Sequence, residues 1–153
     1  CIQIGSFQIG AIVVVNAAGD IYEAGTGKRL AGLLSADRKQ PLDSVAEMCK
    51  CLVPHDQFTG NTTIGAVFTN AAFSKAELNK IASMTRNAYA RSISPVGTMA
   101  DGDSIYAVSI GSEKVDINVA GTLAASVMQE AIRKAVESAR IPEEEFVAAV
   151  QNL

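Results

Sequence analysis

The sequence contains no tryptophan and few aromatic side chains of any kind, since Phe, Tyr and Trp make up only 5% of its 153 residues. Hydrophobic residues nevertheless account for 48%, so the core has to be built from Ala, Val, Ile and Leu. A chain of this length is close to the usual size of one globular domain. Small apolar residues suit helices that lie close against a sheet, and the composition therefore favours a layered α/β protein over a disordered chain.

The sequence also lacks an excess of positive charge, with 13 Lys and Arg against 16 Asp and Glu and a formal net charge of −3. No basic stripe stands out, which argues against a nucleic-acid partner. The longest apolar run lies around Ala11–Val15 and is far shorter than the roughly 18 residues of a membrane-spanning segment. No charged leader precedes an apolar signal core, and we expect no membrane partner.

Three cysteines are an odd number and too few for a disulfide framework. They fit a reducing compartment, which predicts a cytoplasmic location. Cys49, Cys51 and His55 lie close together in the sequence and suggest a metal site, but a fourth ligand is missing and the segment is typical of a linker. The glycines near Lys28 lack the strand–loop–helix context of a phosphate loop. We therefore predict no metal and no other cofactor.

The pattern of apolar residues predicts strands followed by longer helices. Residues Ile2–Asn16 are expected to form two strands or one bent strand, broken near Gly5–Ser6 and Gly10. The uniformly apolar Ala11–Val15 indicates a strand that is covered on both faces. The other predicted elements are a short helix within Pro41–Leu52, a strand over Thr63–Thr69, a helix that begins at Ser74 with a capping box to Glu77, a strand over Ile105–Ile110, a helix over Val115–Arg140 and a last helix from Pro142.

The segment Gly25–Asn61 is polar and rich in turn residues, and we interpret it as a mobile linker. It ends abruptly at Thr62, where an apolar strand begins. An N-terminal Thr is a compact catalyst, because its own α-amine can deprotonate its hydroxyl at near-neutral pH and no His is needed. On its residues alone, Asn61-Thr62-Thr63 is more simply an ordinary turn before a strand, and it is also a glycosylation sequon.

Three segments, AIVVVNAAGD (residues 11–20), GNTTIGAVFTNAAFSKAEL (residues 60–78) and MADGDSIYAVSIG (residues 99–111), resemble one family of enzymes. This is the family of D-aminopeptidase and L-aminopeptidase/D-esterase enzymes, which includes β-peptidyl aminopeptidases and the hydrolase of nylon oligomers. The resemblance covers nearly all of the chain and corresponds to roughly the C-terminal half of the family members. It implies an αββα sandwich of the N-terminal-nucleophile type, incomplete at its N-terminus, and self-cleavage before a Ser or Thr.

By position, the resemblance implies that Thr62 is the nucleophile and that Asn61 ends the first subunit after cleavage. Asn16 matches the Asn that closes the apolar strand and helps to hold the oxyanion. A side-chain amide in that role contributes roughly 3 kcal/mol of transition-state stabilisation. Without the resemblance, Asn16 is a turn-forming residue after a strand.

Asp101 and Asp103 match two positions that are acidic or hydroxyl-bearing in the family. The resemblance implies that they orient the Thr62 amine and hydroxyl and hold a positively charged amine, with Thr63 in support. Acidic residues at both positions are more similar to the nylon-oligomer branch than to the D-aminopeptidase branch. On its own, the Asp-Gly-Asp segment is a tight turn that leads into a strand.

These observations predict a single-domain fragment over residues 1–153, with a linker over 25–61 and a nucleophile-bearing subunit over 62–153. We expect a self-processing hydrolase of a small peptide, amide or ester, which requires the upstream half of the same precursor and assembles as a homo-oligomer. Two alternatives stay open. One is an acyltransferase resembling ornithine acetyltransferase, and the other is a non-catalytic relative that binds a small ligand.

Overall fold

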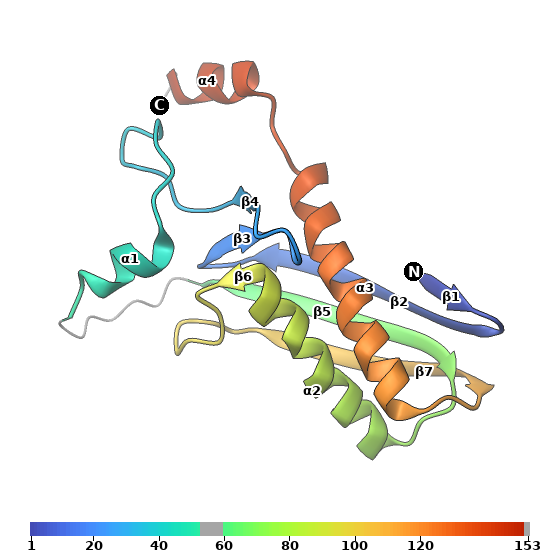
Figure 1. The fold of residues 1–153 in the computed structure, drawn as a ribbon. Coiled ribbons are helices and arrows are strands. Elements are labelled where there is room, and N and C mark those ends of the chain that lie inside the picture. Colours follow the sequence, from blue (N-terminus) through green and yellow to red (C-terminus); the bar gives the residue numbers. More distant parts are fainter. Residues whose placement is uncertain (53–59, 152–153) are drawn as a thin grey trace.

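The fold is built on a four-stranded sheet with the strand order β1-β2-β5-β7 (Figure 1). The computed structural model describes residues 1–52 and 60–151. The strands of this sheet are β1 (Ile2–Ile4), β2 (Phe7–Asn16), β5 (Thr62–Ala71) and β7 (Ser104–Glu113). The first three pair antiparallel, and β7 runs parallel to β5. This parallel pairing requires a crossover connection, which the helix between the two strands supplies.

Two long helices, α2 (Lys75–Ser92) and α3 (Ile117–Ser138), pack side by side on one face of this sheet. The predicted capping box starts α2, since the Ser74 hydroxyl accepts from the Glu77 amide and the Glu77 carboxylate accepts from the Ser74 amide. The core between helices and sheet is fully buried and largely aliphatic. The largest apolar side chains that have almost no exposure are Ile9, Val67, Ile81, Tyr89, Met128 and Ile132.

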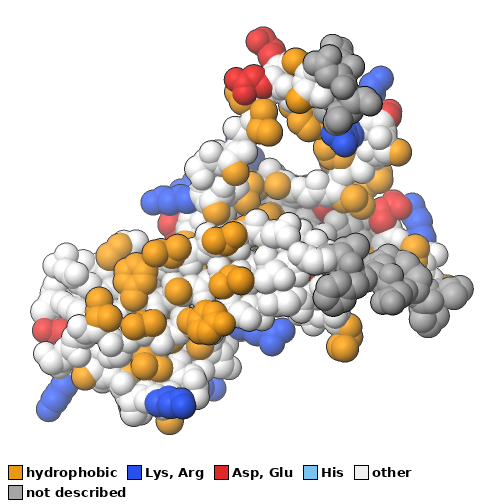
Figure 2. All heavy atoms as spheres, turned by 180° about the vertical axis from the view of Figure 1, so that it is seen from behind, with side chains coloured by type: hydrophobic (Ala, Val, Ile, Leu, Met, Phe, Trp, Pro, Cys, Tyr) orange, Lys and Arg blue, Asp and Glu red, His pale blue; other side chains and the backbone are white. Residues whose placement is uncertain are grey.

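The opposite face of the sheet carries exposed hydrophobic side chains. Ile12 and Val14 of β2 are 64% and 68% exposed, and Tyr106 and Ile110 of β7 are 61% and 70% exposed. Figure 2, the view from behind, shows hydrophobic side chains gathered over this face. The prediction that Ala11–Val15 is covered on both faces is therefore wrong for the described chain, because both long helices lie on the same side of the strand.

A second sheet of three short strands lies beside the first, in the order β4-β3-β6. Its strands are β3 (Asp20–Tyr22), β4 (Arg29–Ala31) and β6 (Ile93–Ser94). The short helix α1 (Ser44–Cys49) and the last helix α4 (Glu143–Gln151) complete the described elements. The chain is thus a mixed α/β protein with two sheets and covering helices, and the predicted α/β class is confirmed.

Part of the segment interpreted as a linker, residues 25–61, is regular structure that Asp20 holds in place. This carboxylate is 1% exposed and accepts from the Arg29 guanidinium (2.8 Å), the Leu33 amide (2.9 Å), and the amide (2.9 Å) and hydroxyl (2.7 Å) of Ser44. The sequence did not reveal these contacts, because they join β3 to residues far along the chain. Residues 53–59, which include His55, lie outside the described part.

The break between β1 and β2 falls at Gly5, whose φ of 59° favours glycine, as predicted. No break occurs at Gly10, which continues β2. A Cβ atom there would lie 2.6 Å from the ring of Phe68, so this glycine makes room for an aromatic side chain of the neighbouring strand. None of the helices in the described part of the chain is long and apolar enough to cross a membrane.

Candidate active site

The Asn61–Thr62 bond lies inside the sheet, held between two neighbouring strands. On one side Asn16, the last residue of β2, pairs with Thr62. On the other side Asn61 forms a parallel bridge with Asp101, which extends the pairing of β5 with β7. The sheet therefore brings Asn16, Thr62 and the Asp101–Asp103 segment together, although they lie far apart in the sequence.

The Thr62 hydroxyl lies beside the carbonyl group that precedes it. Its Oγ1 atom is 2.7 Å from the carbonyl oxygen of Asn61, to which it donates a hydrogen bond. The same oxygen accepts a second hydrogen bond, at 3.1 Å, from the backbone amide of Gly102. A Cβ atom at position 102 would lie 2.6 Å from Thr62 Oγ1. A side chain at position 102 would therefore require the Thr62 hydroxyl to move from this position.

Asn16 contacts the residue before the predicted cleavage site. Its Nδ2 atom donates to the carbonyl oxygen of Gly60 at 3.0 Å. Asn16 is exposed, and alternation along β2 puts its side chain on the same uncovered face as Val14. In the uncut chain this side-chain amide therefore binds the segment that leads into Thr62.

Asp103 holds the residue that follows Thr62. Its Oδ1 atom accepts a hydrogen bond from the Thr63 amide at 2.7 Å. Burial raises the pKa of this carboxyl above its ordinary value, and the charge of Asp101 raises it further. The Thr63 amide and the Arg86 guanidinium act in the opposite direction but do not cancel the effect. At a given pH, Asp103 is therefore protonated to a greater extent than a free Asp side chain.

Asp101 has a different role in the local geometry from that of Asp103. Its Oδ2 atom accepts from the amide of Thr98 at 2.7 Å and from the Thr98 hydroxyl at 2.9 Å, which closes the turn before β7. Among the hydrogen bonds of the described residues, its carboxylate makes none directly to Thr62 or Thr63. Its action on the Thr62 amine and hydroxyl stays a prediction. Asp101 contacts the Asn61–Thr62 bond, here called the junction, through its backbone, which pairs with Asn61.

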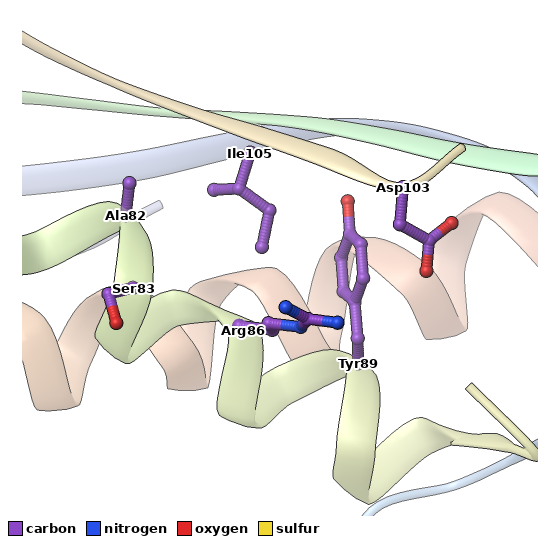
Figure 3. Close-up of a pocket in the computed structure, with 6 residues that line it drawn as sticks. All are labelled: Ala82, Ser83, Arg86, Tyr89, Asp103 and Ile105. Atoms are coloured by element: carbon purple, nitrogen blue, oxygen red, sulfur yellow. The ribbon is translucent and has the colours of Figure 1, made fainter. Parts of the chain in front are cut away.

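A cavity of about 260 Å³ opens on the helix side of the sheet, with Asp103 in its wall. Its lining residues are Ala82, Ser83, Arg86 and Tyr89 of α2, together with Asp103 and Ile105 (Figure 3). Tyr89 rises from the helix towards the strand end that carries Asp103, and its hydroxyl lies 3.4 Å from the carbonyl oxygens of both Thr63 and Ser104. Burial raises the pKa of Tyr89, and Asp103 adds to this effect. Tyr89 therefore stays neutral, and its hydroxyl donates towards the carbonyl oxygens of Thr63 and Ser104.

Thr63 itself is fully buried, and its hydroxyl has no hydrogen-bond partner. Its contribution to the site is therefore made by its backbone, through the amide bound to Asp103 and the carbonyl group beside Tyr89. No group of three His, Cys, Asp or Glu side chains suited to a metal ion occurs within residues 1–52 and 60–151. Cys49 and Cys51 are exposed free thiols.

The family model described as Peptidase family S58 matches residues 2–146 of the chain. The chain belongs to peptidase family S58. The resemblance stated from the sequence, to aminopeptidases and the hydrolase of nylon oligomers, is thereby confirmed.

Curated members of S58 that are similar to the chain have two kinds of names. A 6-aminohexanoate-oligomer endohydrolase of Paenarthrobacter ureafaciens is 33% identical over 150 residues, which cover 87% of this chain and 42% of the relative. One from Kocuria sp. (strain KY2) is 30% identical over 151 residues, covering 88% and 42%. An uncharacterized aminopeptidase of Mycobacterium tuberculosis (strain ATCC 25618 / H37Rv) is 35% identical over 112 residues, covering 70% and 33%. The chain thus spans less than half the length of each of these relatives.

Three residues of the site were missed by sequence reasoning: Gly102, Arg86 and Tyr89. Gly102 was interpreted only as part of a turn, although a glycine between two candidate acids is a signal of close approach. Arg86 and Tyr89 occupy helical positions with nothing in their spacing to point to β7. Only the packing of α2 on the sheet brings them to Asp103.

Proposed function

We propose that this S58 chain is the part of a self-processing amide hydrolase that carries its nucleophile, Thr62. The observation that carries the proposal is the position of the Thr62 hydroxyl, 2.7 Å from the Asn61 carbonyl oxygen, at a strand end that also gathers Asn16 and Asp103. A hydroxyl in that position needs only a rotation of its side chain to approach the carbonyl carbon. The names of the S58 relatives support the same class of chemistry.

Self-cleavage in this proposal begins with attack of Thr62 Oγ1 on the carbonyl carbon of Asn61. The new C–O bond forms, the C–N bond between the two residues breaks, and the hydroxyl proton ends on the released Thr62 amine. Water then hydrolyses the resulting ester, which leaves a carboxylate on Asn61 and restores the Thr62 hydroxyl. The products are two chain pieces, and Thr62 becomes the first residue of the second piece.

The cleaved form has the groups that amide hydrolysis requires. The free α-amine of Thr62 has a reference pKa of about 7.7–8.0, so it serves as the base for its own hydroxyl near neutral pH. Departure of the segment before Thr62 releases the Asn16 amide from Gly60, and this donor then binds the oxyanion of a substrate. Asp103 keeps Thr63, and with it the Thr62 backbone, in register. The substrate class is a small peptide, amide or ester.

The uncovered face of the main sheet supports a second sheet in the complete protein. Asn16 and Thr62 lie at one end of the same face as the exposed Ile12, Val14 and Ile64. A large exposed apolar patch of this kind marks a surface that another polypeptide covers. In our proposal the cover is the additional length that the S58 relatives carry beyond the matched region, which completes an αββα sandwich and walls the substrate site. Homo-oligomer formation is a further part of the proposal.

Intact mass spectrometry of the full-length protein under denaturing conditions tests the proposal. The wild type is expected to give two pieces, the second beginning at Thr62, and Thr62→Ala a single uncut chain. Thr62→Ser keeps a hydroxyl and is expected to be cut. Thr122→Ala removes an exposed threonine of α3, far along the chain from the site, and serves as the matched control. Cleavage of Thr62→Ala at the same bond would overturn the proposal.

A further inference from the structure

The carbonyl oxygen of Asn61 accepts from two donors of known position. One is the Thr62 hydroxyl, at 2.7 Å, and the other is the Gly102 amide, at 3.1 Å. These two donors differ in what happens to them during self-cleavage. The hydroxyl has to leave the oxygen in order to attack the carbon, whereas the Gly102 amide has no other role in the reaction.

Negative charge develops on the Asn61 oxygen when Thr62 attacks, because the carbonyl group becomes tetrahedral. A donor that already points at this oxygen lowers the barrier without any reorganisation. The Gly102 amide meets this condition, since the bridge between Asn61 and Asp101 aligns the two backbones. Its position is fixed further by the Thr98 contacts of Asp101 before it and by the Thr63 contact of Asp103 after it.

The Asn16 amide is not placed to do the same for self-cleavage. In the uncut chain it donates to the carbonyl oxygen of Gly60, which is one peptide bond away from the carbonyl group that is attacked. In the uncut site the Gly102 amide thus donates to the reacting oxygen, and the Asn16 amide donates to the segment that will be displaced.

We propose that Gly102 is a catalytic residue of self-cleavage, whose backbone N–H stabilises the oxyanion that forms at Asn61. This inference rests on the proposed function. It divides the work between two donors: Gly102 serves the cleavage of the chain itself, and Asn16 serves the later hydrolysis of substrate. Glycine at this position also leaves room for the Thr62 hydroxyl, which a Cβ atom would displace.

The test replaces Gly102 with glycolic acid by nonsense suppression in cell-free translation of the full-length protein. This change turns the N–H into an ester oxygen and leaves the side chain as it is. Self-cleavage is then followed over time by denaturing electrophoresis. Loss of an oxyanion donor is expected to slow the reaction by about 10²–10³-fold. The matched control is glycolic acid at Gly27, whose amide also makes one backbone hydrogen bond, to the Glu23 carbonyl at 3.0 Å.

The outcomes separate the inference from the proposed function. A wild type that is cut and a Gly102 ester that is cut at the same rate would overturn the inference alone. A wild type that is never cut overturns both. Limited proteolysis of the uncut protein checks the fold: slow cleavage with the protease resistance of Thr62→Ala supports the inference. If slow cleavage comes with a loss of this resistance, or if the Gly27 ester is slowed equally, the effect is due to folding and the inference is overturned.

Discussion

The backbone amide of Thr63 donates to the Oδ1 atom of Asp103 at 2.7 Å, so a carboxylate holds the residue next to the candidate nucleophile. The contact joins the start of β5 to the segment that enters β7 and fixes the direction of the Thr62 backbone. Because the donor is a main-chain group, the proposed break before Thr62 would leave this contact intact. We therefore propose that Asp103 is a positioning residue in the uncut chain and in the cleaved one.

Replacement of Asp103 tests this role. Asp103→Ala removes the acceptor and is expected to slow self-cleavage by about 10–100-fold, since a hydrogen bond to a charged group contributes roughly 1.5–3 kcal/mol. Asp103→Asn keeps an oxygen acceptor and is expected to lose less. The measurement is the rate at which the full-length chain disappears, and Asp37→Asn, an exposed loop carboxylate, is the control. Equal rates for Asp103→Ala and the control would contradict the assignment.

The pH dependence of self-cleavage should reflect the raised pKa of Asp103. The ionised carboxylate is the form that accepts the Thr63 amide, so the rate is expected to fall as the pH drops through this pKa, above the ordinary value for an Asp. Asp101 raises the pKa and Arg86 lowers it, while Tyr89 faces Asp103 as a neutral group. Arg86→Gln is therefore expected to move the acid limb to higher pH, and Arg86→Lys to leave it near the wild-type position.

The control for this pH experiment is Arg140→Gln, which removes an exposed positive charge beyond the end of α3. An acid limb that stays in place or moves to lower pH in Arg86→Gln, or an equal shift in Arg140→Gln, would contradict a specific effect of Arg86 on the pKa of Asp103.

Asn16→Ala should affect the two reactions unequally. Substrate hydrolysis is expected to slow by about 10²–10³-fold, because the variant lacks a donor to the substrate oxyanion. Self-cleavage is expected to slow less, since Asn16 binds Gly60 and not the carbonyl group that is attacked. Turnover of 6-aminohexanoate oligomers and of amino-acid p-nitroanilides by cleaved protein gives the first rate, and electrophoresis gives the second. Asn87→Ala, on the exposed side of α2, is the control. A larger loss in self-cleavage than in turnover would contradict the assignment of Asn16 to substrate hydrolysis.

Asp20→Ala should destabilise the fold without removing a contact at the Asn61–Thr62 junction. It leaves Arg29, the Leu33 amide and Ser44 without their shared acceptor, and loss of one partner of a buried ion pair costs about 3–5 kcal/mol. Chemical denaturation in the uncut Thr62→Ala background measures the free energy of unfolding. Asp37→Ala, which is exposed, is expected to remain close to its parent.

The same carboxylate makes a pH-dependent contribution to stability. Burial alone would raise the pKa of Asp20, but the hydrogen bonds from Ser44 and Leu33 and the charge of Arg29 outweigh it and lower the pKa. A lowered pKa in the folded state means that the stabilisation is fully present above the ordinary Asp value and disappears as the pH falls through the folded value. Asp20→Asn is therefore expected to flatten the acid side of the stability profile; an unchanged profile would contradict it.

Sequence patterns were sufficient for the elements whose signals are local. The apolar run before Asn16, the capping box at Ser74 and the proline before α4 each depend on neighbours within a few residues, and the structure has an element at each of these places. The residues that meet at the junction were found by a different route, the resemblance to a family, since no periodicity relates Asn16 to Asp103.

What the sequence did not predict depends on contacts between distant segments. The resemblance assigned both Asp101 and Asp103 to the Thr62 amine and hydroxyl, but it did not reveal that Asp101 Oδ2 closes a turn with Thr98. The same limit applies to Asp20, which no sequence pattern singled out. Its buried carboxylate gathers polar groups from a segment that appeared to be a linker, and burial of this kind is decided only when the sheets and loops assemble.

The pairing of β2 with β5, from Ile9 opposite Thr69 to Asn16 opposite Thr62, has a consequence for the cleaved protein. A break between Asn61 and Thr62 assigns these two strands to different molecules that remain joined by a shared sheet and core. Unfolding then separates two chains, so its midpoint temperature should rise with protein concentration, whereas that of uncut Thr62→Ala should be much less sensitive. Refolding would likewise require the two pieces to meet, so the cleaved protein is expected to recover from thermal unfolding more slowly than uncut Thr62→Ala.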